Sequence, residues 1–344
     1  MGVGMELETL QLLAALAIVV ALVFYALSGG ADFGGGVWDL LARGPRAERQ
    51  RDFISHAIGP IWEANHVWLI LAIVVLFTAF PPAFSRIMTI LHIPLFLMLL
   101  GIVARGAAFS FRSYGSPRGE TQRHWGWVFA IASLVTPLLL GVILGAIASG
   151  TVTAGPQSAE VFVTSWLGLF PLSVGLYALV MFAFLAAVYL TVEAEEEDLR
   201  EDFRRRALAS GLLLGVLAAG ALGAAGLRVP EILHDLTRTS WSWALHACTA
   251  AAALVALFAL WTRRYRLARV AAIVQVTLII LGWAFSQYPH LVKPDLTYQE
   301  AAAPPITLRL MLGALALGAL VLFPSFFYLF RIFGKVPRGR ARTR

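Results

Sequence analysis

Residues 54–77 read ISHAIGPIWEANHVWLILAIVVLF, a hydrophobic stretch long enough to cross a bilayer as a helix. Its first half contains an ionisable carboxyl, Glu63, and the polar residues Asn65 and His66 follow closely in the chain. A charged side chain within a membrane costs roughly 2.5–3.5 kcal/mol on insertion scales, so such residues usually face a protein interior or an ion path. Glu63 is therefore either a proton-relay acid or a hydrogen-bonded acid that holds helices together.

The whole chain has the composition of a membrane protein. Of its 344 residues, 59% are hydrophobic and 14% are charged, and the mean hydropathy is +0.77. Backbone polar groups cannot remain unpaired in hydrocarbon, and the alternation typical of a barrel is absent from the sequence, so we predict an all-α polytopic membrane protein. Nine spans are expected, near 10–27, 54–77, 87–104, 127–148, 161–192, 207–227, 243–261, 270–285 and 308–330.

The net charge of +7 is best explained by topology. With nine spans, most Lys and Arg residues fall in alternate loops and in the C-terminal segment, the pattern expected of a cytoplasmic face. The opposite loops hold only Arg86, Arg228, Arg238, Lys293 and Arg309. We therefore expect the N-terminus outside and the C-terminus inside, with the basic face attracted to anionic lipid rather than to nucleic acid.

A single integral membrane domain is expected over residues 1–344. The polar residues that could do chemistry gather in the first three spans, within 1–112, whereas 125–333 holds six blander spans and 334–344 is a basic tail. No metal site is expected, because no set of carboxylates and histidines has the spacing of metal ligands.

The first span ends in a glycine-rich segment, SGGADFGGG at residues 28–36. A phosphate-binding loop is excluded, because no strand precedes the segment and no Lys-Ser/Thr pair follows it. Within a membrane helix, glycines allow tight packing or a backbone break, and we expect Asp32 to be presented from such a break toward the inner face. Arg105, at the inner end of the third span, is either an anchor that reaches the lipid headgroups or the partner of Asp32.

Glu63 is expected in the inner half of the membrane. It lies about nine residues into its span from the inner face, or roughly 13 Å at 1.5 Å per residue. His56 and His66 are placed seven residues before it and three after it, so a continuous helix would present all three on one broad face. Burial of a carboxyl favours its protonated form, which suits a proton relay.

Two other functions remain open at this point. His66, His92 and His246 could ligate a haem axially from facing helices, which would make the chain a b-type haem electron carrier. We favour a hydrogen-bonding or proton-relay role for His66, because it lies in a polar cluster. A proton-coupled secondary transporter could use Glu63 as its coupling acid, but it would be expected to show two broken helices in related halves, and this sequence has one glycine-rich segment.

Several motifs occur in a characteristic order: YALSGGADFGGG at 25–36, PIWEANHVW at 60–68, FTAFP at 77–81, and Arg105 followed by FSFR at 109–112. Together they resemble subunit II of the cytochrome bd-type quinol oxidases. The matching motifs cover roughly the first third of the chain. The remainder agrees with that family in length, in its nine spans and in orientation.

That resemblance implies two four-helix bundles plus one peripheral helix, in a heterodimer with a subunit I that carries the haems and the quinol site. The complex would be a terminal oxidase of the bacterial cytoplasmic (inner) membrane that reduces O2 to water and generates a proton motive force. This chain would bind no haem and would supply a cytoplasmic proton path to the haem site of subunit I. The family also implies a structural quinone in some members, and small accessory membrane subunits remain a further expectation.

The resemblance also assigns residues. By motif position, Glu63 falls where the family has its channel Asp, Asp32 matches the second acid of the pattern in the first helix, and Arg105 matches the Arg of the third helix. Glu63 and Asp32 are therefore expected on the proton path. The supporting residues are expected to be Asn65 and His66, and the structural ones Arg105, Trp62 and Trp68.

The sequence departs from the family pattern at four of these positions. Gly29 replaces the first acid of the helix-one pattern, so any role of that acid is absent or has moved. Glu in place of Asp at position 63 keeps the carboxyl and lengthens its reach by one methylene. Ala64 and His66 also depart from the commonest form of the motif. We therefore expect a divergent branch, with altered haem content in the partner or altered cyanide sensitivity.

Overall fold

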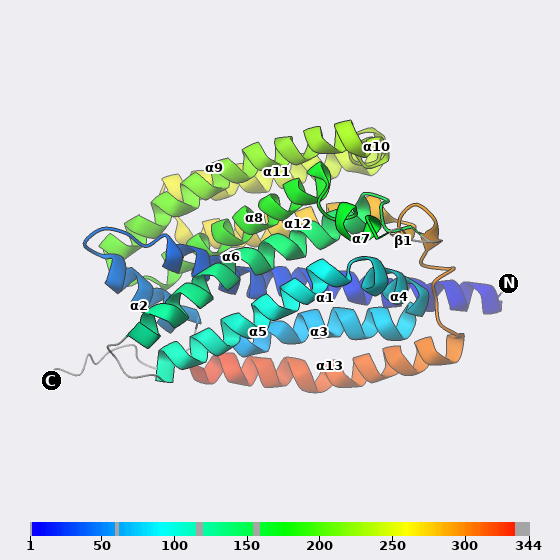
Figure 1. Cartoon of the computed structure of the whole chain (residues 1–344), viewed down its shortest axis with the longest axis horizontal. Helices are drawn as coiled ribbons and strands as arrows, with labels where there is room; N and C mark the ends of the chain where they lie inside the picture. The colour runs from blue at the N-terminus through cyan, green and yellow to red at the C-terminus, as the bar shows by residue number, and fades with distance from the viewer. Residues whose placement is uncertain (1, 59–61, 115–119, 154–158, 334–344) are drawn as a thin grey trace.

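A computed structural model describes residues 2–58, 62–114, 120–153 and 159–333, which form an elongated bundle of long helices (Figure 1). Among these residues, eight helices are long and apolar enough to cross a membrane, or nine if α3 and α4, bent by 118°, count as one span. The prediction of an all-α polytopic membrane protein is confirmed. In chain order the helices are α1 (Gly2–Leu40), α2 (Ala47–Ile58), α3 (Trp62–Ala79), α4 (Pro81–Ile90), α5 (His92–Tyr114), α6 (Glu120–Ala148), α7 (Val161–Thr164), α8 (Leu169–Glu193), α9 (Glu197–Arg228), α10 (Pro230–Arg238), α11 (Ser240–Trp261), α12 (Tyr265–Gln287) and α13 (Pro305–Phe333), with strands β1 (His290–Val292) and β2 (Leu296–Thr297) between α12 and α13.

The long helices form two four-helix bundles plus one peripheral helix, as predicted. The first bundle contains α1, α3, α5 and α6, and the second contains α8, α9, α11 and α12. Helix α8 packs on both α1 and α6 and so joins the two bundles. Its second half is buried all round, with Phe182, Leu185 and Val188 at 1% exposure or less, as expected of a helix segment that is apolar on every face. Helix α13 contacts α1 and α3, and only 6% of its most apolar segment is buried within the protein, so it is the peripheral helix (Figure 1).

Helix α1 continues without a break through the glycine-rich segment at residues 28–36, so the expected backbone break is wrong. The glycines serve tight packing instead. A Cβ at Gly34 would lie 2.0 Å from the carbonyl oxygen of Phe182 on α8, and one at Gly36 would lie 2.1 Å from Ser133 Oγ on α6. Close packing of an intact helix keeps the backbone groups paired inside the membrane, whereas a break would expose them.

The span expected over residues 54–77 is not one helix. Helix α2 ends at Ile58 and α3 begins at Trp62, with residues 59–61 outside the described part of the chain. Pro60 accounts for a boundary here, because proline lacks the N–H that a helix needs and disfavours helical backbone at the preceding residue. Position 63 therefore lies in the first turn of α3 rather than about nine residues into a span. His56 belongs to α2, where its Nδ1 lies 2.7 Å from the Asp52 carbonyl, so it does not share a helix with position 63.

The fifth expected span, over residues 161–192, is also divided. The short helix α7 is followed by α8, and Gly168 between them has extended backbone. Pro171 in the first turn of α8 fits this start, because the N–H that proline lacks has no partner within a helix at that position. The third expected span begins later than predicted, at His92, because α4 occupies residues 81–90.

We expect Gly34→Ala to destabilise the protein. The added methyl would force α1 and α8 apart, and overpacking of this kind costs about 1–3 kcal/mol. Gly215→Ala on α9 is the matched control, because its Cβ would meet no atom within 4 Å, and alanine is the better helix former. The midpoint of thermal unfolding of the purified protein checks this, and equal midpoints for the two variants would contradict the proposed close approach.

Candidate functional site

A buried ion pair links α1 to α5. Asp32 and Arg105 are 4% and 2% exposed. Arg105 Nη1 donates to Asp32 Oδ2 at 2.7 Å, and Nη2 donates to Oδ1 at 2.8 Å and to the Asp32 carbonyl oxygen at 3.0 Å. Two parallel bonds between guanidinium and carboxylate are the strongest geometry that such a pair adopts. The predicted contact between Asp32 and Arg105 is confirmed, and Arg105 is not an anchor in the headgroup region.

The third nitrogen of the guanidinium holds α6 in place. Arg105 Nε donates to Ser133 Oγ at 3.1 Å, and Ser133 Oγ lies 2.7 Å from the Phe129 carbonyl oxygen, to which it donates. The guanidinium carbon is 4.9 Å from the Phe33 ring centroid and 4.8 Å from that of Phe129. A charge removed from water needs such complete pairing to be tolerated. One side chain therefore fixes α1, α5 and α6 relative to one another.

A second ion pair joins α1 to α5. It lies two helical turns beyond the first pair on both helices. Arg112 Nη1 and Nη2 donate to Asp39 Oδ2 and Oδ1, each at 3.0 Å. Arg51 on α2 donates from Nε to the Asp39 carbonyl oxygen at 3.2 Å. The sequence interpretation missed Asp39. The equal spacing of seven residues, from Asp32 to Asp39 and from Arg105 to Arg112, is the signal that could have revealed it.

Beside the first ion pair, His66 on α3 lies against two rings of α1. Its ring centroid is 6.1 Å from that of Tyr25 and 6.0 Å from that of Phe33. His66 Nδ1 and the Tyr25 hydroxyl are both buried and have no hydrogen-bond partner among the described residues. Gly29 makes room for the tyrosine, since a Cβ there would lie 2.8 Å from the Tyr25 ring. Two buried hydrogen-bonding groups thus lie beside the ion pair, in which all three guanidinium nitrogens are engaged.

The remaining predicted residues lie along the same helix. Asn65 is buried at 5% exposure, and Trp68 is buried and stacked on Phe24 of α1 with centroids 4.4 Å apart. Trp62 and Glu63 belong to the first turn of α3, but their side chains lie outside the described residues. Position 63 is one helical turn before His66. The structure thus brings Asp32, Arg105 and His66 together around Phe33.

The other histidines lie in different surroundings. His92 Nδ1 is 2.9 Å from the Thr89 carbonyl oxygen, and His246 Nε2 is 2.7 Å from that of Leu236. The described residues contain no group of three or more His, Cys, Asp or Glu side chains that could hold a metal ion. The geometry gives no support to a di-haem carrier built on His66, His92 and His246.

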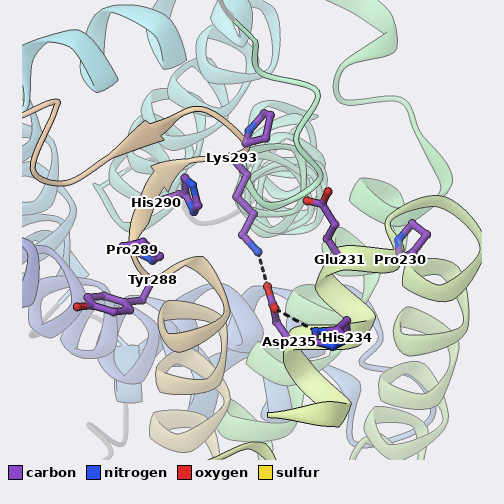
Figure 2. A pocket seen from close by; sticks show the side chains of 9 residues that line it. Pro230, Glu231, His234, Asp235, Tyr288, Pro289, His290 and Lys293 are labelled. Carbon is purple, nitrogen blue, oxygen red and sulfur yellow. Dashed lines mark hydrogen bonds and ion pairs between the residues drawn. The ribbon is translucent and has the colours of Figure 1, made fainter.

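Two cavities lie away from this cluster, at opposite ends of the bundle. The larger, about 500 Å³, is lined by α10 and the β1–β2 hairpin (Figure 2). Within it Lys293 Nζ donates to Asp235 Oδ2 at 2.7 Å, and His234 Nδ1 is 3.7 Å from Asp235 Oδ1. The smaller cavity, about 310 Å³, lies where α1 ends and α9 begins.

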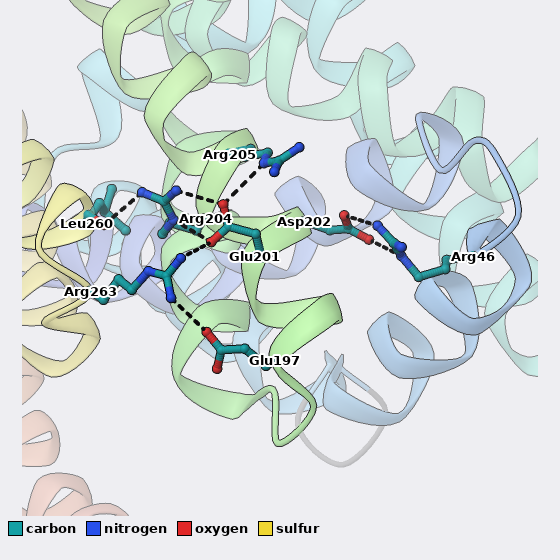
Figure 3. Close-up of polar contacts among 8 residues, drawn as sticks. All are labelled: Arg46, Glu197, Glu201, Asp202, Arg204, Arg205, Leu260 and Arg263. Carbon is teal, nitrogen blue, oxygen red and sulfur yellow. Dashed lines mark hydrogen bonds and ion pairs between the residues drawn. The ribbon is translucent and has the colours of Figure 1, made fainter.

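Arginines gather at this second end of the bundle, called the basic end below. Glu201 on α9 forms ion pairs with Arg204, Arg205 and Arg263, and Arg46 pairs with Asp202 (Figure 3). The side chains involved are partly or fully exposed. Exposed pairs of this kind each contribute about 0–1 kcal/mol to the free energy of unfolding. They therefore mark this end of the bundle as basic but add little to stability.

Breaking the buried pair is expected to destabilise the protein strongly. Asp32→Asn or Arg105→Met leaves an uncompensated group inside the bundle, at a cost of about 3–5 kcal/mol. The double variant should lose less than the sum of the two single variants, because it removes both charges. Chemical denaturation of the purified protein measures the three free energies.

Glu6→Gln is the control, since the Glu6–Arg309 pair is half exposed and its loss should cost about 0–1 kcal/mol. Strictly additive losses for Asp32→Asn and Arg105→Met would show that the two charges do not stabilise each other.

Comparison with known proteins identifies the family. A sequence model of cytochrome bd terminal oxidase subunit II matches residues 10–333. The chain is 25% identical to the putative cytochrome bd menaquinol oxidase subunit II of Bacillus subtilis, over 96% of this chain and 97% of that one. It is 29% identical to the cytochrome bd-I ubiquinol oxidase subunit 2 of Escherichia coli, over 42% of this chain and 38% of that one.

The fold agrees as well. The structure matches the bd oxidase from Geobacillus thermodenitrificans with a TM-score of 0.79 at 22% identity, covering 94% of this chain and 98% of that one. The predicted family is confirmed, and neither the transporter nor the haem carrier is favoured by these matches. The chain belongs to the family of cytochrome bd terminal oxidase subunit II.

Proposed function

We propose that this chain is the non-haem subunit of a quinol:oxygen oxidoreductase and conducts protons from the cytoplasm toward the oxygen-reducing haem of subunit I. Membership of the family makes it a subunit of a quinol oxidase complex. The observation that carries the proton role is the placement of His66 beside Phe33 and the buried Asp32–Arg105 pair. Reduction of O2 to water consumes protons, so a haem within the membrane needs such a route.

The two kinds of polar group in the cluster have different tasks. Arg105 donates to both carboxylate oxygens and to the carbonyl oxygen of Asp32. This ion pair fixes the helices and organises the mouth of the path. His66 Nδ1 and the Tyr25 hydroxyl have no hydrogen-bond partner within the described part of the chain. Buried groups of this kind are normally satisfied by ordered water, which could complete a chain of hydrogen bonds.

Position 63 is the proposed entry to this chain. It lies in the first turn of α3, one turn before His66. A carboxyl at the end of a helix can exchange protons with the aqueous face and pass them inward. Asn65, buried on the same turn, is proposed to support this region.

The orientation proposed from the sequence fits the arrangement of charges. The basic end of the bundle, where α9 begins, gathers Arg46, Arg204, Arg205 and Arg263 (Figure 3). We place this end at the cytoplasmic face of the bacterial inner membrane, with the N-terminus outside and the C-terminus inside. The proposed partner is the haem-bearing subunit I. A structural quinone and small accessory subunits belong to the same proposal.

We expect Glu63→Gln to lower oxygen-reduction turnover at least tenfold, because the amide cannot carry a proton and proton transfer by a positioned group contributes about 10²–10⁴-fold. The complex should assemble with the partner's haem spectrum unchanged. Glu63→Asp is the control and should retain part of the turnover. Oxygen consumption by the purified complex measures this, and wild-type turnover of Glu63→Gln would rule out the relay role.

A second pair of variants separates packing from proton transfer at His66. His66→Phe keeps a ring between Tyr25 and Phe33 but removes both nitrogens, so we expect normal thermal stability and at least tenfold slower turnover. His66→Gln keeps hydrogen-bonding atoms, but its amide cannot carry a proton, so its turnover should be lowered as in His66→Phe. Full turnover of His66→Phe would mean that the ring of His66 serves packing alone.

A further inference from the structure

The smaller cavity, at the basic end, has an unusual charge balance. It lies between the connection from α1 to α2 and the first turns of α9. Four of its seven lining residues are arginines and one is acidic. The seven are Arg43, Pro45, Arg46, Gln50, Asp202, Arg205 and Arg206. Figure 3 shows two of these residues, Arg46 and Asp202, facing each other.

The one carboxylate of the cavity, Asp202, already accepts hydrogen bonds. Arg46 donates to Asp202 from Nε at 2.9 Å and from Nη2 at 2.7 Å, and Gln50 Nε2 donates to Asp202 Oδ2 at 2.7 Å. Arg205 contacts a carboxylate through Nε alone, at 3.2 Å from Glu201 Oε1. The hydrogen bonds to Asp202 thus come from Arg46 and Gln50, and the one carboxylate faces four arginines.

Arg206 is held in place by its neighbours, but one of its N–H donors has no partner among the described residues. Arg206 Nη2 donates to Gln50 Oε1 at 2.6 Å, and the guanidinium carbon lies 5.4 Å from the Trp38 ring centroid and 5.2 Å from that of Phe203. Arg206 Nη1 is buried and has no hydrogen-bond partner among the described residues. A buried charged donor without an acceptor is costly, so an acceptor supplied by a ligand would be stabilising.

We propose that this cavity binds a phosphate group, carried either by the headgroup of an anionic phospholipid or by a soluble phosphate. Phosphate offers several acceptor oxygens and a negative charge, and guanidinium groups bind it through two parallel hydrogen bonds. Arg206 supplies the fixed donor, and Arg43 and Arg205 are exposed at the rim. The site lies at the end of apolar helices, where basic pockets meet lipid headgroups. It is separate from Asp32, Arg105 and His66, so it does not depend on the proton path.

The test uses the full oxidase complex, stripped of lipid in detergent. The double variant Arg43→Gln/Arg205→Gln removes two rim donors that Asp202 does not engage. The matched control Arg264→Gln/Arg266→Gln removes the same charge from exposed residues outside the cavity. Native mass spectrometry is used to titrate each protein with cardiolipin, with the zwitterion phosphatidylcholine and with inorganic phosphate.

We expect one anionic ligand per complex, bound at least tenfold more weakly by the cavity variant and within about twofold of wild type by the control. Preference for cardiolipin identifies a headgroup, and preference for inorganic phosphate identifies a soluble source. The preferred ligand should also raise the unfolding temperature of the wild type but not of the cavity variant. Equal weakening in both double variants, equal binding of phosphatidylcholine, or no binding of any probe to the wild type would overturn the proposal.

Discussion

The bundle depends on one constraint, the need to neutralise two charges inside a membrane. Asp32 and Arg105 are both buried, and the arginine reaches from α5 past α6 to α1 with all three of its nitrogens engaged. Such a pair forms only if three helices are held at one depth and one rotation. The glycines of α1 serve the same end, because Gly34 lets that helix approach α8 and Gly36 makes room for Ser133, which holds Arg105. Close packing and charge pairing thus support one another.

Two kinds of polar group lie in the first bundle. Asp32 and Asp39 each form an ion pair with an arginine, which holds the carboxylate in place. His66 Nδ1 and the Tyr25 hydroxyl have no hydrogen-bond partner among the described residues. The proton path proposed above uses this second kind of group, while the ion pairs hold the surrounding helices. His66 departs from the commonest form of the family motif, and the proposed path continues through its ring.

The sequence predicts much of this for physical reasons. Apolar stretches of bilayer length predict helices, because lipid leaves the backbone no other partner. The Asp32–Arg105 contact follows from the free-energy cost of leaving either charge unpaired, since both residues lie at similar depth.

Details that depend on three-dimensional packing could not be predicted from the sequence. The glycine-rich segment is compatible with a break or with close contact, and only the presence of α8 decides for contact. The division between α2 and α3, which puts position 63 in the first turn of a helix, involves a proline whose effect a hydropathy pattern does not show. Asp39 was missed because its partner, Arg112, is explained equally well as a topology signal.

The seven-residue spacing shared by the two ion pairs has a mechanical consequence. Helices α1 and α5 run in the same direction, and each carries its charged residue at two positions one heptad apart. A slide of α5 along α1 by one turn would separate both arginines from both carboxylates at once. A slide by two turns would leave at most one of the two pairs. The two pairs together therefore favour the single axial setting in which both arginines meet a carboxylate.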